Sequence, residues 1–431
     1  MKKYIIILFL SCFAFGQQTP APQQTKSILI TGGKAHLGNG KIIENSIISI
    51  KEGKIAMIAD GTNVKPEKHD IYIDASKKHI YPGFIGANAT LGLVEVDAVK
   101  ASDDENEMGE MNPHIRSIIA YNTESGLVEA ARPNGVLLVQ IAPRGGRISG
   151  TSSIVQLDAW NWEDAIVKEN DGIHLNWPKS FSRAGWWAEP GGIEPNKNYD
   201  KQITEIQDFY NDAKAYLSAN TTVRDIPYEA MKGLDTGSKS LFIHVDGEKE
   251  IVDAILFKKK NNISKMTIVG GYYAFKNASL LKENNVSVLL RRVHDLPLLE
   301  DEDVNLPYKN AKLLDDAGIL IGLQNAGDME RMQIRNLPFY AGTCAAWGMD
   351  KERALQLITS NTAKILGIDA NYGTLETGKS ATLFISEGDA LDISTNEVSV
   401  ALIDGRSISL ESHQTELYNR YKKKFETQAK E

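Results

Sequence analysis

Residues 81–92 read YPGFIGANATLG, and this stretch decides the fold of the chain. A Pro-Gly pair at 82–83 marks its start, an apolar pair follows at 84–85, and Gly86 begins a turn outward. This order is typical of a buried strand followed by the loop that leaves it. We therefore predict a barrel strand here, with Asn88 and Thr90 at the point where the strand ends.

Further strands of this kind follow along the chain. The run VLLVQIAP at 136–143 is almost continuously apolar, as in a parallel strand that is covered on both faces. SLFIHV at 240–245 leads into a helix, and MTIVGG at 266–271 opens another strand, helix and strand. Residues 206–219, IQDFYNDAKAYLSA, have helical spacing and predict a helix on the outside of the barrel. The alternation of strands and helices indicates an α/β fold.

Length and composition limit the number of domains and the class of protein. The chain has 431 residues, which suits a barrel of about 250 to 350 residues and a smaller second domain. Its hydrophobic content of 42% and charged content of 24% are those of an ordinary folded protein. The formal net charge of -8 and the lack of a basic patch disfavour nucleic acid as a partner.

The first residues have the pattern of an export signal. Two lysines precede a short apolar run at 5–15, and small residues follow it, so we predict a signal peptide at 1–16 and cleavage before Gln17. The protein is then periplasmic or secreted, with lipoprotein processing at Cys12 as the second alternative. The polar stretch 17–26 is predicted to be a linker, and no transmembrane segment is expected in the mature chain.

Several motifs together resemble the amidohydrolase superfamily. The first barrel strand of that family ends in PGFID-x-H-x-H, which residues 82–90 follow in frame. The loop PRGGRISG at 143–150 and the sequence up to residue 166 resemble the imidazolonepropionase-like branch. The resemblance continues through RNLPFYAG at 335–342 and LITSNTAKILGI at 357–368 and covers almost the whole mature chain.

The resemblance implies a TIM-type (β/α)8 barrel with a small β-sandwich domain built from both chain ends. We place the composite sandwich at 27–79 plus 371–412, because YGTLETGK at 372–379 resembles the C-terminal strands of the family. The barrel is expected at 80–370 and a helical tail at 413–431.

The resemblance also implies zinc or another divalent metal at the strand ends, where histidines and carboxylates activate a water molecule. Only one of the expected positions retains its ligand, namely His244. Neutral or side-chain-free residues stand at the others, so the alternative is that no metal is bound. These residues are Asn88, Thr90, Gly270 or Gly271, and Ala326 or Asn325, with Asp328 as a substitute if the register shifts.

Other residues are candidates for contact with a substrate. Arg144 and Arg147 lie in a Gly-rich loop that follows a parallel strand, so they either bind an anion or belong to a tight turn. Asn88 at the end of the first barrel strand and Tyr272 after the sixth are further candidates for substrate binding. His294 and Asp295 follow the seventh, as a catalytic pair or as a simple surface pair.

Three hypotheses about function follow. The first is a hydrolase of non-peptide carbon–nitrogen bonds in a small amide, cyclic or open, with an unusual metal site that combines His244 with Glu95, Asp97 or Asp328. The second is a catalytically inactive homologue that binds a small molecule or pairs with an active amidohydrolase. The third is metal-free hydrolysis by His244, Asp246 and the His294–Asp295 pair. A homo-oligomer is compatible with each hypothesis.

Overall fold

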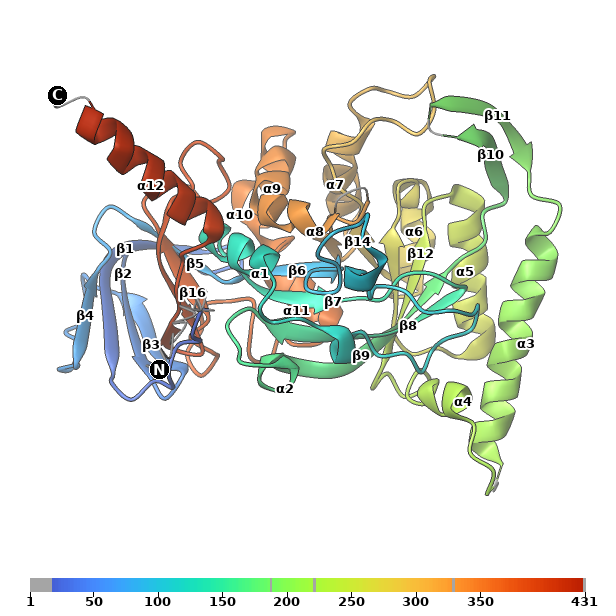
Figure 1. Ribbon diagram of the computed structural model, residues 1–431, viewed down its shortest axis with the longest axis horizontal. Helices are drawn as coiled ribbons and strands as arrows, with labels where there is room; N and C mark the ends of the chain where they lie inside the picture. The colour runs from blue at the N-terminus through green and yellow to red at the C-terminus, as the bar shows by residue number, and fades with distance from the viewer. Residues whose placement is uncertain (1–17, 187, 220–221, 328–329, 429–431) are drawn as a thin grey trace, which may run out of the picture.

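The structure is a computed structural model that describes residues 18–186, 188–219, 222–327 and 330–428. The predicted signal peptide and Asp328 lie outside the described residues. The chain forms a sheet domain at one end and a barrel at the other, as Figure 1 shows.

The sheet domain combines strands from both ends of the chain. Its strand order is β18-β17-β16-β5-β1-β2-β3, with β4 paired to β1. Isoleucines and leucines from both chain segments share one core, including Ile48, Ile80 and Leu402. The pairing of distant segments is observed, whereas the two-layered sandwich and the exact domain limits remain predictions. The strands are β1 (Ile28–His36), β2 (Ile42–Lys51), β3 (Lys54–Asp60), β4 (Ile71–Asp74), β5 (His79–Pro82), β16 (Leu383–Ser386), β17 (Val398–Ile403) and β18 (Arg406–Ser407).

The barrel is a second sheet of eight strands in the order β15-β14-β13-β12-β9-β8-β7-β6. A parallel bridge between Ala87 and Gln324 joins its two edges, so the sheet is nearly closed. Its strands are β6 (Phe84–Ala89), β7 (Val136–Ile141), β8 (Ile148–Gln156), β9 (Ile166–Asn176), β12 (Ser240–Val245), β13 (Met266–Gly270), β14 (Ser287–Leu290) and β15 (Ile321–Leu323).

The regular (β/α)8 topology needs one correction. β8 runs antiparallel to both of its neighbours, β7 and β9, whereas the other barrel pairs are parallel. Only residues 142–147 connect β7 to β8, which is too short for the crossover that parallel strands require. Gly145 and Gly146 adopt φ angles of 79° and 57°, which suit glycine in this tight turn. A hairpin therefore replaces one strand–helix unit, and the barrel has fewer helices than expected.

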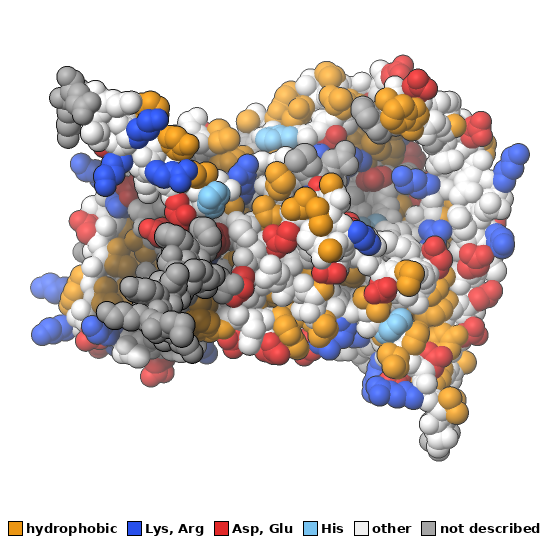
Figure 2. Space-filling model, viewed as in Figure 1, with side chains coloured by type: hydrophobic (Ala, Val, Ile, Leu, Met, Phe, Trp, Pro, Cys, Tyr) orange, Lys and Arg blue, Asp and Glu red, His pale blue; other side chains and the backbone are white. Residues whose placement is uncertain are grey.

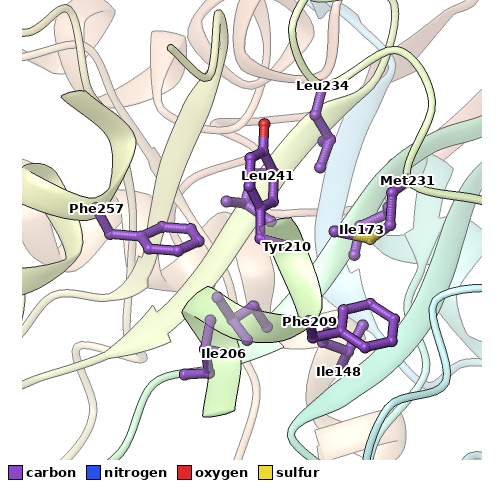
Figure 3. Close-up of a pocket in the computed structure, with 10 residues that line it drawn as sticks. Ile148, Ile173, Ile206, Phe209, Tyr210, Met231, Leu234, Leu241 and Phe257 are labelled. Atoms are coloured by element: carbon purple, nitrogen blue, oxygen red, sulfur yellow. The ribbon is translucent and has the colours of Figure 1, made fainter. Parts of the chain in front are cut away.

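Helices cover the outside of the barrel and close its lower end, which is the end where the strands begin. The predicted outer helix is α3, and Figure 3 shows the small apolar cavity between it and the barrel wall, lined by residues such as Ile173, Phe209 and Met231. The helix α11 packs against β6 and β15, and the N–H of Ile85 donates to the carbonyl of Ile358 at 2.9 Å. The main helices are α1 (Gly126–Ala131), α3 (Tyr199–Ser218), α5 (Glu248–Asn261), α6 (Ala278–Glu283), α7 (Leu306–Asp316), α8 (Glu330–Gln333), α9 (Leu337–Ala346), α10 (Lys351–Gln356), α11 (Ser360–Leu366) and α12 (His413–Gln428).

The remaining elements are short. A hairpin of β10 (Phe181–Trp186) and β11 (Glu189–Pro195) precedes α3. The short helix α2 (Trp162–Ala165) connects β8 to β9, and the short helix α4 (Ile226–Ala230) follows α3. Among the described residues, no helix is long and apolar enough to cross a membrane.

Candidate functional site

Asn88 occupies the carboxyl end of β6, where the resemblance places the first metal-binding histidine. It is fully buried and adopts a positive φ of 51°, which asparagine tolerates better than most residues. Its N–H donates to Oε1 of Gln140 at 3.0 Å, and its Nδ2 donates to Oε1 of Gln324 at 3.4 Å. Amide side chains from β6, from β7 and from the end of β15 therefore meet at this rim of the barrel.

Arg144 lies directly on Asn88. Its Nη1 donates to Oδ1 of Asn88 at 3.0 Å, and its Nη2 donates to the carbonyl of Asn88 at 2.8 Å. Nη2 also donates to Oε1 of Glu330 at 2.6 Å, in an ion pair whose side chains are only 19% and 10% exposed. The Gly-rich loop thus delivers a guanidinium cation to the strand ends, and that cation is fixed by an amide and a carboxylate.

The segment after β15 supplies no carboxylate at the expected position. The N–H of Ala326 donates to Gln324 Oε1 at 2.6 Å, and Nδ2 of Asn325 donates to the carbonyl of Glu330 at 2.6 Å. Oε2 of Glu330 accepts the N–H of Gly327 at 2.9 Å. Among the described residues of this segment, the carboxylate at the mouth is Glu330, and it is paired with Arg144.

A buried carboxylate lies deeper in the barrel. Asp171 on β9 accepts hydrogen bonds from Nε2 of Gln140 and from Oγ of Ser152, each at 2.7 Å. Burial raises the pKa of Asp171, and the hydrogen bond from Ser152 opposes that rise. The sequence analysis missed this residue, because its position on the inner face depends on the β8–β9 hairpin.

Two histidines form a pair at the ends of β9 and β12. Nδ1 of His174 lies 2.8 Å from Nε2 of His244, and the His174 ring stacks on Phe242 with centroids 4.8 Å apart. His174 is fully buried, while His244 keeps partial exposure to the mouth. Burial, with the positive charge of Arg144 nearby, lowers the pKa of His244 to about 3, and burial lowers the pKa of His174 well below its usual value. Both rings are therefore neutral at neutral pH.

His174 was also missed by the sequence analysis. The signal that could have found it is the strand IHLN at 173–176, in which a histidine stands near the carboxyl end. Its pairing with His244 follows from the direct neighbourhood of β9 and β12, where Leu175 is the register partner of Ile243.

The residues present do not fit a catalytic zinc ion. Neutral imidazole is the form that binds metal, but the facing nitrogens of His174 and His244 are bonded to each other. Asn88 and Thr90 offer only neutral oxygens, and Gly270 offers none. Within the described parts of the chain, no group of three histidine, cysteine, aspartate or glutamate residues could hold a metal ion.

Gly270 could not simply be replaced to restore the sixth-strand ligand. It has a φ of 101°, and a Cβ at this position would lie 2.7 Å from Oδ1 of Asp246. Thr90 is buried, and its hydroxyl has no hydrogen-bond partner. The positive φ and the close contact disfavour a histidine at 270, and Thr90 offers a neutral hydroxyl where the family has an imidazole.

Arg147 and Tyr272, which the sequence analysis assigned to substrate binding, have structural partners. Nη1 of Arg147 donates to the carbonyl of Asn176 at 2.9 Å and so holds the end of β9. Tyr272 is fully buried and donates to Oε2 of Glu302 at 2.8 Å. Burial raises the pKa of Tyr272 to about 12, and the hydrogen bond to Glu302 adds to this rise.

His294 and Asp295 have different partners and do not form the expected catalytic dyad. Nε2 of His294 lies 2.7 Å from the hydroxyl of Thr343, and burial lowers the pKa of this imidazole. Asp295 accepts Nη2 of Arg291 at 2.5 Å. Arg291 also lies 3.5 Å from Asp246, so it joins two carboxylates at the mouth.

Glu95 and Asp97, the other candidate acids, are also engaged. Glu95 accepts hydrogen bonds from Asn122 and Ser125, and Asp97 pairs with Arg331. Both carboxylates are therefore held by these partners. Figure 2 shows a recess with charged side chains at its rim, between α7 and the ends of β12 and β14.

The fold defines a barrel protein with a second sheet domain built from both chain ends. The model of the amidohydrolase family matches residues 218–409. Imidazolonepropionase from Flavobacterium johnsoniae is 20% identical over 427 residues, which cover 90% of this chain and 97% of that relative.

Solved structures agree in fold. A crystal structure of an amidohydrolase from Thermotoga maritima has a TM-score of 0.74 and 21% identity, and the match covers 89% of this chain and 99% of that chain. A Xaa-Pro dipeptidase with bound methionine has a TM-score of 0.55 and 16% identity, covering 89% of this chain and 100% of that chain. These matches support the amidohydrolase superfamily and its imidazolonepropionase-like branch, and so confirm the resemblance found in the sequence.

Proposed function

We propose that this protein binds a small molecule with an amide or related carbon–nitrogen bond at its barrel mouth, and that it does not hydrolyse it through a metal-bound water. Family membership supports the hydrolase fold and the ligand class. The observation that carries the proposal is the guanidinium of Arg144, bonded to both oxygens of Asn88.

Electrostatics give the physical reason. Two unit charges of the same sign about 4 Å apart repel by about 4 kcal/mol near a protein surface, and a divalent ion doubles this figure. A metal beside Asn88 would therefore meet the charge of Arg144. Glu330 pairs with the same guanidinium and Arg144 donates to both oxygens of Asn88, so those oxygens are occupied by a cationic side chain.

The histidine pair does not supply a strong base in place of the metal. A general base works best when its pKa lies near the operating pH. The pKa of His244 is lowered to about 3, so its imidazole is neutral but only weakly basic. Metal-free hydrolysis by His244 and Asp246 therefore has less support than binding alone.

The second candidate function is hydrolysis of a carbon–nitrogen bond in a small, cyclic amide. It is favoured by the partial exposure of His244, which leaves a neutral imidazole within reach of a ligand in the mouth. In the metal-dependent form of this hypothesis His244 is the one retained ligand, and zinc is the cofactor that the family implies.

Metal content and turnover separate the two candidates. The protein is purified from medium that contains zinc, manganese and iron, its bound metal is measured by mass spectrometry, and it is assayed against a panel of cyclic amides, imidazolones and dipeptides. We expect less than one tenth of an equivalent of metal and saturable binding of a panel member without turnover. Stoichiometric metal, with turnover that a chelator abolishes, would establish the hydrolase instead.

Arg144→Met is the variant for the binding measurement. It removes the charge at the mouth but keeps a side chain of similar length, and we expect at least a tenfold loss of ligand affinity, which corresponds to about 1.4 kcal/mol. Lys201→Met on the exposed face of α3 is the matched control, because the Lys201 side chain is 77% exposed. Equal affinity in both variants would contradict a ligand site at Arg144.

Export to the periplasm or the medium, and pairing with a second copy or with an active amidohydrolase, remain part of this proposal. The sequence of the first sixteen residues supports the former. An inactive homologue that retains the family fold is suited to the latter.

A further inference from the structure

The helix α12 stands apart from the body of the protein, as Figure 1 shows. Ser412 and Thr415 cap its start, with the N–H of Ser412 donating to the Thr415 hydroxyl at 2.8 Å. In the first turn, Gln414 lines a small cavity together with Leu127 and Arg331. The 16 residues of the helix include no buried residue. Its first turn is therefore seated on the body, and the rest of the helix presents its side chains to the surroundings.

Three aromatic side chains form a stripe along α12. Tyr418, Tyr421 and Phe425 are 64%, 50% and 61% exposed. Their spacing of three and four residues places them within an arc of about 60° on one face of the helix. Aromatic rings in an unpartnered row of this kind mark an interaction site more often than isolated surface residues do.

Basic side chains flank the stripe on both sides. Lys422 lies over the Tyr418 ring at 5.8 Å from its centroid, Lys424 lies over Phe425 at 5.7 Å, and Arg420 lies over Tyr421 at 5.4 Å. Helical geometry puts Lys422 and Lys424 on opposite edges of the aromatic face. Basic and apolar side chains gather over α12 in Figure 2, although the chain as a whole has a net charge of -8.

We propose that α12 lies on an anionic lipid surface, with the aromatic stripe in the headgroup region and the flanking cations near the phosphates. A helix with a narrow apolar face and lysines at its edges is suited to this interface, because the lysine stems can follow the apolar boundary while the ammonium groups reach the headgroups. Tyrosine prefers the same boundary, since its ring is apolar and its hydroxyl is polar.

Charge complementarity favours lipid over a second copy of the chain. Four of the residues between 420 and 424 are basic, so two α12 helices packed along their stripes would bring like charges together. An anionic leaflet instead attracts each lysine or arginine near its surface by about 1 kcal/mol, a factor of about five in partition.

The start of the described chain lies at the same place. Nε2 of Gln18 donates to the carbonyl of Glu411 at 2.5 Å, immediately before α12. The described chain therefore begins beside the start of α12.

Vesicle flotation tests the proposal. The full chain is mixed with vesicles of phosphatidylcholine alone or with one third phosphatidylglycerol, at low and high salt. We expect binding to the anionic vesicles that is at least tenfold stronger than to the neutral ones and that weakens with salt. The triple variant Tyr418→Ser, Tyr421→Ser, Phe425→Ser should lose about 100-fold or more in partition, and Lys422→Glu with Lys424→Glu should lose at least tenfold.

Trp160→Ser is the matched control, because Trp160 is a 63% exposed aromatic residue outside α12. Its partition should equal that of the unmodified chain. Equal flotation of the α12 variants and the unmodified chain would overturn the proposal. So would a concentration-dependent dimer in sedimentation that the aromatic variant dissociates, because the stripe would then be covered by a second copy. Circular dichroism of each variant checks that the fold is retained.

Discussion

The two ends of the barrel differ in the chemistry of their side chains, which are apolar at one end and polar at the other. At the lower end, Ile85, Leu138 and Leu289 pack with Ala363 and Leu366 of α11 in one apolar cluster. At the upper end, where the strands terminate, Asn88, Gln140 and Arg144 form a polar network. The lower end keeps the family sequence LITSNTAKILGI, whereas the upper end has replaced the family ligands. Stability and chemistry occupy opposite ends of such barrels, so one can be retained while the other changes.

The largest effect is expected at the lower end. Leu289 is fully buried in the apolar cluster. Leu289→Ala leaves a cavity and should lower the free energy of unfolding by about 3–4 kcal/mol in urea titrations. Leu313→Ala on α7, whose side chain is 41% exposed, should cost less than about 1 kcal/mol. Similar losses at both sites would contradict the assignment of stability to this cluster.

A smaller loss is expected when the upper network is broken. Glu330→Gln leaves the Arg144 guanidinium mostly buried without its carboxylate, and we expect about 2–3 kcal/mol of destabilisation. The control is Glu205→Gln, which breaks an exposed pair with Lys201 and should change stability by less than about 0.5 kcal/mol. An unchanged midpoint for Glu330→Gln would mean that the ion pair does not hold the mouth.

Acid should lower the free energy of unfolding through His244 at the upper end. The folded state holds the pKa of His244 at about 3, while an unfolded histidine has a pKa of about 6.5. The unfolded chain therefore binds protons first as the pH falls, so the stability from this group is complete above pH 6.5 and is lost down to about pH 3. Between pH 7 and pH 5 the loss should be about 2 kcal/mol.

His244→Gln should flatten this part of the stability curve, measured by denaturant titration at several pH values. His413→Gln is the control, since His413 lies on α12 with a 71% exposed side chain. If both variants keep the full acid slope, the buried histidine pair is not its source.

The smallest expected effect has the opposite sign. Thr90 is buried, and its hydroxyl has no partner, so Thr90→Val should stabilise the protein by about 1 kcal/mol. Thr151 is equally buried, but its hydroxyl donates to the carbonyl of Pro113 at 2.7 Å, so Thr151→Val should destabilise by about 1 kcal/mol. Thermal unfolding of the two variants compares them directly. Destabilisation by Thr90→Val would show that this hydroxyl has a partner in solution.

Much of the fold was predictable, because its signals are local. The apolar runs at 136–141 and 240–245 became β7 and β12, and the helical spacing near residue 206 became α3. The hairpin of β8 was missed, although the six residues after β7 are too few for a parallel crossover. That error hid Asp171 and His174, whose inward positions depend on β9 lying next to β8.

The sequence by itself determined the fold family and the loss of ligands, since a glycine at 270 and an asparagine at 88 cannot act as histidine in any structure. Only the tertiary structure decided what took their place. Arg144 reaches Asn88 across 56 residues of chain, and Glu330 reaches Arg144 across 186. Such contacts depend on the closure of the barrel, and no local pattern of residue types encodes them.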